Sequence, residues 1–233
     1  MGFSMRRSGL YYSPLDAAFM VVLALLLGIA VALIEIGALS FAYERLGIDR
    51  QWVYVLLLGS ILGAFVNIPV ARFHGHTEVD NTVVSFMGVR YRVPQVVETG
   101  RTVLAVNLGG AVVPAALAGY LIAHDALGWR ALWAVLIVSL FVNRMARPVQ
   151  SVGIVVPTLL PPVLAVLTAE VIGGRHVAAL AYAAGTLGAL IGADLLNLPR
   201  IRRWGAPVVS IGGAGTFDGI FVTGVVAVLL ASI

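Results

Sequence analysis

The sequence predicts an all-α integral membrane protein of seven transmembrane helices, with a small cytoplasmic β-hairpin between the second and the third. Three observations carry this prediction. Hydrophobic residues make up 60% of the chain and charged residues only 11%, whereas charged residues make up about 25% of a typical soluble domain. Long apolar blocks follow one another along the chain, and the one long polar interruption alternates in the manner of two short strands.

Seven apolar blocks come close to the length of about 20 residues that a spanning helix needs. The first is too long for the core of a signal peptide and no small-residue cleavage site follows it, so we expect it to be a retained span. The fourth is short and is edged by arginines. The blocks run from Ala17 to Ser40, Trp52 to Ala71, Thr102 to Ala123, Ala131 to Ala146, Val152 to Ile172, Val177 to Leu198 and Val208 to Ile233.

The basic residues predict the orientation of the chain. All fifteen are Arg, and eleven of them fall on the side of the N-terminus when the loops alternate. Because cytoplasmic loops carry an excess of Lys and Arg, we expect a multi-pass protein of the cell (inner) membrane with its N-terminus in the cytoplasm and its C-terminus outside. The arginines form no dense patch, which argues against nucleic acid as a partner, and without Cys no thiol chemistry is available.

The hairpin is predicted in the polar segment between the second and third blocks. Residues Thr82 to Phe86 and Val89 to Val93 flank Met87 and Gly88, and apolar residues of the second run alternate with arginines. Because only water or headgroups can satisfy the edges of such a hairpin, we expect it outside the hydrocarbon region.

Just before the hairpin, four side chains of types that ligate metals alternate with other residues. An extended chain would present all four on one face, which gives a candidate metal site at strand spacing. No fixed ligand spacing of a known site is matched, and a solvated polar loop accounts for the same residues. The four are His74, His76, Glu78 and Asp80.

Two parts of the chain resemble each other, which predicts an internal repeat. The stretch from Gly59 to Pro69 resembles that from Gly188 to Pro199, and Asn107 to Ala111 resembles Ser210 to Ala214. Parallel repeats of this kind occur in several transporter folds. We therefore expect one polytopic domain, 1–233, in a parallel 3+1+3 arrangement: repeat A over about 17–123 with a hairpin insert at 72–100, a linker helix over 124–147, and repeat B over about 148–233.

Asp194 and Asp218 are the candidate functional acids. An ionisable side chain at membrane depth is costly and marks a functional site by default. Asp194 lies shortly before Pro199 and a cluster of arginines, and Asp218 follows a glycine-rich run in which a regular helix is disfavoured. Two structural alternatives stay open: Asp194 reaches the arginines as an ion pair near the surface, and Asp218 lies in the capped first turn of the last helix.

Together the two acids allow two kinds of chemistry. Two carboxyl groups in one cavity can share a proton, which gives an acid and a base that activate water for attack on a carbonyl. The same pair could instead bind a proton or a cation and release it on the other side. Nearby helix breaks would supply binding groups, and the candidates are Asn107, Gly109, Gly110, Asn197, Gly212, Gly213, Gly215 and Thr216.

Four runs carry a family resemblance. They are Asn107 to Ala111, Val152 to Pro162, Gly192 to Leu198 and Ser210 to Phe221. In these runs the chain is similar to the multi-pass proteins grouped as domain of unknown function 1614. The resemblance extends from the third block to the end, and it implies a membrane protein without implying an activity.

The order of the two acids resembles that of the Gly-x-Gly-Asp intramembrane aspartyl proteases of presenilin type. Those enzymes place one Asp near the cytoplasmic end of a sixth span and another after Gly-x-Gly at the start of the seventh, so the resemblance implies Asp194 and Asp218 as a catalytic pair. The chain departs from that pattern: two residues separate the glycines from Asp218, Ala193 stands where a Tyr is expected, and no Pro-Ala-Leu follows.

Three functions follow from these observations. The first is a diacid intramembrane hydrolase with Asp194 and Asp218 as its catalytic pair. The alternatives are a proton- or ion-coupled small-solute transporter with the same acids as coupling residues, and a non-catalytic subunit of a membrane complex. The expected partners are the lipid bilayer and a transmembrane peptide, a small solute or an ion; a homo-oligomer is allowed, and no cofactor is expected.

Overall fold

The structure is a computed structural model, and it describes residues 25, 36–74, 83–86, 89–92, 101–149, 153–201, 208–213 and 219–232. Over these residues the chain is mostly helical, with several short strands. The described residues from 40 onward belong to one compact unit, and those before 40 belong to another. The first predicted span therefore lies mostly outside the described residues.

Helices make up most of the larger unit, and three segments depart from regular α geometry. The α-helices are α2 (Arg50–Gly63), α3 (Val113–His124), α4 (Gly128–Met145), α5 (Leu160–Ile172), α6 (Val177–Ala189), α7 (Leu198–Ile201) and α8 (Gly219–Leu230). A π-helical segment, η1 (Leu108–Val112), leads into α3. A second, η2 (Leu190–Asp194), and the 3-10 segment η3 (Leu195–Asn197) join α6 to α7.

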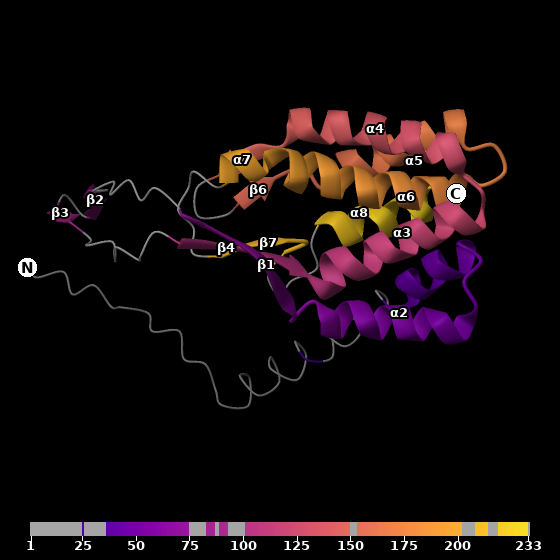
Figure 1. Cartoon of the computed structure of the whole chain (residues 1–233), viewed down its shortest axis with the longest axis horizontal. Helices are drawn as coiled ribbons and strands as arrows, with labels where there is room; N and C mark the ends of the chain where they lie inside the picture. The colour runs from indigo at the N-terminus through magenta and orange to yellow at the C-terminus, as the bar shows by residue number, and fades with distance from the viewer. Residues whose placement is uncertain are drawn as a thin grey trace, which may run out of the picture. The chain divides into compact units, whose positions relative to one another are not determined.

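Helix α6 lies at the centre of the helical bundle. It packs against α3, α4, α5 and α8 (Figure 1), and ten of its thirteen residues are buried. Most of those ten are Ala, Gly or Thr, small residues that let helix backbones approach closely. A helix without a polar face is expected where neighbours cover it on all sides.

Glycines allow the closest contacts of this central helix. A Cβ added to Gly192 would lie 2.5 Å from the carbonyl oxygen of Ser139 in α4. A Cβ added to Gly188 would lie 2.5 Å from a methyl carbon of Val138 in the same helix. On another side, a Cβ added to Gly224 of α8 would overlap the Thr186 hydroxyl of α6. The absence of a side chain at these glycines therefore lets α4 and α8 lie close to the central helix.

A three-stranded sheet lies at one end of the helices (Figure 1). Its strands, in order, are β1 (Asn67–His74), β4 (Arg101–Asn107) and β7 (Val208–Ile211). β1 runs antiparallel to β4, and β4 runs parallel to β7 with Leu104 opposite Val209. Leu104 and Ile211 form a small core with Leu190 at the end of the central helix. The sheet therefore packs against the part of the chain that carries Asp194.

Two further strand pairs are present. The predicted hairpin is confirmed, because β2 (Val83–Phe86) pairs antiparallel with β3 (Val89–Arg92). The second pair joins β5 (Arg147–Val149) to β6 (Gly153–Val155), also antiparallel.

Four of the blocks expected as whole helices contain a strand, and for those parts the all-helical prediction is wrong. The second block passes from α2 into β1, the third begins with β4, the fifth with β6 and the seventh with β7. These parts are rich in Val and Ile, which favour strands. Periodicity alone cannot separate a buried strand from a short buried helix, so the sequence predicts each of these blocks as one uninterrupted helix.

The helices give a weak indication of membrane association. Within the part of the chain that the structure describes, one helix, Val177–Arg200, is long and apolar enough to cross a membrane, and 61% of its most apolar stretch is buried inside the protein. A core helix of a soluble protein can have the same length and composition. Shorter apolar helices run over Leu108–His124, Leu160–Ile172 and Gly219–Leu230, and the seven-span topology stays a prediction.

We expect Gly192→Ala to destabilise the bundle, because its new Cβ would meet the Ser139 carbonyl oxygen at 2.5 Å. Overpacking of this kind costs about 1 to 3 kcal/mol, measurable as a lower midpoint of thermal unfolding by circular dichroism in detergent. Gly119→Ala in α3 is the matched control: nothing lies within 4 Å of its added Cβ, and Ala improves helix propensity by about 1 kcal/mol. Equal midpoints for the two variants would contradict the close packing of α4 on η2.

Candidate functional site

Asp194 is the last residue of η2, where the central helix ceases to be regular. Its Oδ2 accepts a hydrogen bond of 3.1 Å from the backbone N–H of Gly212, which directly follows β7. Gly212 has a φ of +82°, a conformation that glycine adopts readily and other residues rarely do. The carboxylate is therefore held by a turn that requires glycine.

A cavity of about 330 Å³ opens beside Asp194. Its walls come from α4, from β6 and the segment leading into α5, from the end of α6 with η2, and from the start of α8. The lining is mostly apolar, and its polar side chains are Thr158, Asp194 and Thr223. Gly219, the residue after Asp218 in the chain, lines the same cavity. An apolar pocket with a few converging polar groups is the usual form of a ligand site.

Two glycine pairs meet close to this cavity. Gly109 and Gly110 lie between β4 and α3, and Gly212 and Gly213 follow β7. A Cβ added to Gly110 would overlap the carbonyl oxygen of Gly212, and a Cβ on Gly212 would lie 2.6 Å from that of Ala111. The ends of two parallel strands therefore turn in direct backbone contact.

Asn107 is fully buried and ties this junction to α2. Its Nδ2 donates to the Ala64 carbonyl oxygen at 2.7 Å and to Asn67 Oδ1 at 3.1 Å, and its Oδ1 accepts from the Gly110 N–H at 2.7 Å. The Ser210 hydroxyl lies 2.6 Å from the same Asn67 oxygen. Sequence reasoning did not single out Asn67 or Ser210 as site residues, because their contacts depend on the strands that it assigned to helices.

Asn197, also fully buried, holds the carbonyl groups beside Asp194. Its Nδ2 donates to the carbonyl oxygens of Gly192 at 3.0 Å and Ala193 at 2.9 Å, and its Oδ1 accepts from Arg200 at 2.8 Å. Asn143 of α4 also donates to the Gly192 carbonyl, at 3.1 Å. Amide side chains thus satisfy backbone groups where the regular helical hydrogen bonds are interrupted.

The structure brings one group of predicted site residues together and leaves another undescribed. Asp194 contacts Gly212, Gly212 contacts Gly110, and Gly110 is capped by Asn107. That the two acids meet stays a prediction, and so do the roles of the candidate residues in the glycine-rich run before Asp218. Those that lie outside the described residues are Gly215, Thr216 and Asp218.

The predicted metal ligands are mostly outside the described residues as well. The backbone of His74 ends β1, while His76, Glu78 and Asp80 are not described. Among the residues that are, no group of three or more His, Asp or Glu side chains could hold a metal ion. The metal site at strand spacing stays a prediction.

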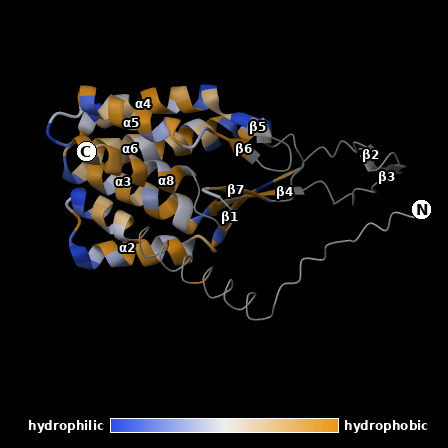
Figure 2. Cartoon of the chain, turned by 180° about the vertical axis from the view of Figure 1, so that it is seen from behind, coloured by the Kyte–Doolittle hydropathy of each residue, from blue (hydrophilic) through white to orange (hydrophobic). Residues whose placement is uncertain are grey.

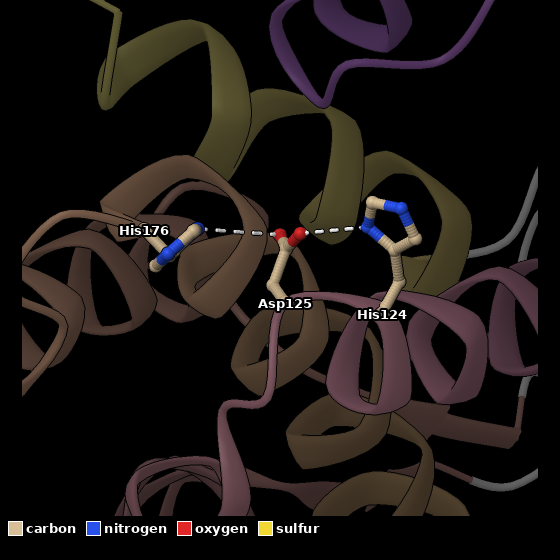
Figure 3. Close-up of polar contacts among 3 residues, drawn as sticks. All are labelled: His124, Asp125 and His176. Atoms are coloured by element: carbon tan, nitrogen blue, oxygen red, sulfur yellow. Dashed lines mark hydrogen bonds and ion pairs between the residues drawn. The ribbon is translucent and has the colours of Figure 1, made fainter.

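A second polar cluster, which sequence reasoning missed, lies at the other end of α6 (Figure 3). His124 Nδ1 is 3.0 Å from Asp125 Oδ1, and His176 Nδ1 is 3.6 Å from Asp125 Oδ2. His176 precedes α6, so at a rise of 1.5 Å per residue the cluster is about 27 Å from Asp194. It joins the turn after α3 to the turn before α6 and takes no part in the cavity.

Hydroxyl groups form a third polar cluster, between the helical residues 40–45, α2 and α6. Tyr43 and Tyr182 are among the largest fully buried side chains, and Ser60 is buried beside them. Burial raises the pKa of Tyr43 from 10.0 to about 12, and the neighbouring Ser60 and Tyr182 hydroxyls partly offset that rise.

We expect Asn107→Asp to destabilise the protein, since the substitution keeps the acceptor for Gly110 but removes both donated hydrogen bonds. Leaving the Ala64 carbonyl without its partner and burying a charge costs at least about 1 to 3 kcal/mol. Denaturant unfolding followed by Trp fluorescence measures the change. The control is Asn67→Asp, which is exposed and keeps its acceptor oxygen, so we expect less than about 0.5 kcal/mol; a loss as large as that of Asn107→Asp would refute this assignment.

We expect stability to fall above pH 10 because of Tyr43. In the unfolded chain this hydroxyl ionises near 10.0, but in the folded protein it keeps its proton to about 12, so its contribution is complete below pH 10 and is lost as pH rises toward 12. Each unit by which the pKa of the folded state exceeds that of the unfolded state corresponds to a loss of about 1.4 kcal/mol in the free energy of unfolding. The absorbance of tyrosinate, followed as pH is raised, measures the pKa of the Tyr43 hydroxyl. Tyr43→Phe should remove one group that ionises near pH 12. An unchanged titration curve in this variant would contradict the burial of Tyr43.

Comparison with known proteins gives a family match but no closer relative. The match covers residues 61–230, and the family is described as protein of unknown function (DUF1614). No curated protein and no solved structure matches the chain, so these comparisons do not support the resemblance to presenilin-type proteases. The matched region contains both acids and every element around the cavity. Because it extends over well more than half of the sequence, the chain belongs to the DUF1614 family.

Proposed function

We propose that the chain is a multi-pass membrane protein that hydrolyses a bond in a membrane-embedded substrate with Asp194 and Asp218. The observation that carries the proposal is the cavity shared by Asp194 and Gly219. Asp218 directly precedes Gly219 in the sequence, and we propose that its carboxyl group reaches the same cavity. Two carboxyl groups on one small cavity are the arrangement that diacid catalysis needs.

In this proposal Asp194 is the general base. The Gly212 N–H donates to its Oδ2, and such a donor stabilises a carboxylate in its ionised form. Asp194 takes a proton from water as the water attacks the substrate carbonyl, while a protonated Asp218 gives its proton to the carbonyl oxygen. When the tetrahedral adduct collapses, the C–N bond breaks, Asp194 passes its proton to the leaving amine and Asp218 recovers one from the adduct.

The cavity walls favour an apolar substrate. Apart from Thr158, Asp194 and Thr223, the lining side chains are hydrocarbon or absent. A volume of about 330 Å³ admits a short apolar segment of a peptide, with the two threonines as the hydroxyl groups near its backbone. A transmembrane peptide is therefore the substrate class that we propose.

Exposed apolar surface supports the membrane location. Figure 2 shows mostly hydrophobic colour along the helices and hydrophilic colour at their ends. Soluble monomers rarely expose contiguous apolar patches larger than a few hundred Å², whereas here large apolar side chains are exposed along α2, α4 and α5. Among them are Leu58, Leu62, Leu132, Leu136, Leu140, Val163, Leu167 and Val171. With the first apolar block as a further span, we propose seven crossings with the N-terminus in the cytoplasm.

A proton- or ion-coupled transporter is the second candidate, and the meeting of Gly110 with Gly212 favours it. Transporter sites form where interrupted helices meet, and here Gly110 and Gly212, which follow the ends of β4 and β7, are in backbone contact. In that case Asp194 would bind the coupling ion instead of activating water. A non-catalytic subunit would show neither activity.

We expect Asp194→Asn and Asp218→Asn each to lower cleavage of model transmembrane peptides by at least about 100-fold, the usual contribution of a general acid or base. The purified full-length variants are assayed in vesicles for cleavage and, in parallel, for proton flux. Asp49→Asn, an exposed acid before α2, is the control and should keep wild-type activity.

The two assays separate the candidates. Loss of proton flux in both variants, without any cleavage by the wild type, assigns the transporter. Wild-type protein with neither activity assigns the subunit, and undiminished cleavage by either Asn variant refutes the diacid mechanism.

A further inference from the structure

We propose that the lipid-facing surface of this protein fits a hydrocarbon region of about 20 to 25 Å, thinner than the roughly 30 Å of a typical bilayer. The proposal rests on the membrane location proposed above. It concerns the thickness of the apolar belt, and it is independent of which reaction the cavity supports.

Acyl chains are the occupant that the exposed apolar surface fits. Helices α2 and α4 lie on opposite sides of the bundle in both views (Figures 1 and 2), and each exposes large apolar side chains such as Leu62 and Leu132. A protein partner covers one face of a molecule, whereas lipid surrounds it. Apolar exposure on opposite sides therefore favours lipid over a second protein chain.

Helix α4 gives the clearest measure of thickness because one side of it is exposed along its length. Arg130 and Arg144 lie near its two ends, fourteen residues apart, which is about 21 Å at 1.5 Å per residue. Leu132, Leu136 and Leu140 are exposed between them. Charged side chains avoid the hydrocarbon, so the two arginines bound the apolar stretch.

The other exposed helices agree with this length. α5 has 13 residues, about 20 Å, and its Val171, which is 86% exposed, comes just before the Gly173 and Gly174 turn. α2 has 14 residues, about 21 Å. The longer helix Val177–Arg200 is the buried central one, so lipid does not set its length.

Both boundaries of the belt can be located. At one end, exposed aromatic side chains of the kind enriched at membrane interfaces lie near the start of α2, the end of α3 and the start of α4: Trp52, Tyr54, Tyr120, Trp129 and Trp133. At the other end, β1 is an edge strand that begins at Asn67. An open sheet edge does not occur in lipid-exposed hydrocarbon, so the belt ends before Asn67.

The test is the stability of the full chain in bilayers of different thickness. The protein is reconstituted in vesicles of dilauroyl, dimyristoyl, dioleoyl or dierucoyl phosphatidylcholine, and thermal unfolding is followed by circular dichroism. We expect the highest midpoint in dilauroyl or dimyristoyl lipid, with a decrease of several degrees toward dierucoyl lipid. A maximum in dioleoyl or dierucoyl lipid, or no dependence on lipid, overturns the proposal.

A matched pair of variants tests the role of the α4 boundary. Arg144→Leu lengthens the apolar stretch of α4 by about one turn and should move the optimum toward longer acyl chains. Arg147→Leu lies beyond the helix, in β5, and should leave the optimum where it is. Equal shifts in both variants, or none in Arg144→Leu, contradict the boundary.

Extraction with alkaline carbonate separates this proposal from the one it rests on. Protein that stays with the vesicles but shows no preference for thin bilayers removes only the thickness proposal. Protein released from the vesicles removes the membrane location as well.

Discussion

The close approach of α6 to its neighbours is the interaction on which the rest of the structure depends. Small residues let helices approach one another closely. Gly188 and Gly192 allow that approach to α4, and Gly185 and Gly224 allow it between α6 and α8. These helices also form three walls of the cavity, so the glycines that hold the bundle together also define the space beside Asp194.

The π-helical segment after α6 determines which side chain faces that space. A π-helical turn adds one residue to a helix, which rotates every later side chain by about 100° relative to a regular α-helix of 3.6 residues per turn. In η2 the insertion ends at Asp194, and the backbone there is held by amide donors from Asn143 and Asn197 to the Gly192 carbonyl oxygen. The Gly212 N–H in turn holds the Asp194 carboxylate at the cavity.

Local patterns predict some of these features, and long-range pairing decides the others. The hairpin from Val83 to Arg92 could be predicted because two residues join strands with a period of two. The departure from regular helix at the glycine pairs follows from the backbone freedom of glycine, although the chain enters both pairs from a strand and not from a helix. The strands β4 and β7 could not be predicted, because they pair across about a hundred residues and apolar periodicity does not distinguish them from helix. For the same reason the buried role of Asn107, whose partner Ala64 lies 43 residues away, has no local signal.

The two stretches of similar sequence, Gly59 to Pro69 and Gly188 to Pro199, take different backbone paths. Gly63 and Ala64 correspond in sequence to Gly192 and Ala193, but the chain leaves α2 to become the edge strand β1, while it continues from α6 through η2 as a helix. The freed carbonyl of Ala64 takes its hydrogen bond from the distant Asn107, whereas that of Ala193 is satisfied four residues along the same helix. Phe65, the residue after Ala64, is consequently 73% exposed, and an acid there would lie on the surface. Only the half that keeps its helix brings a carboxylate to the wall of a cavity.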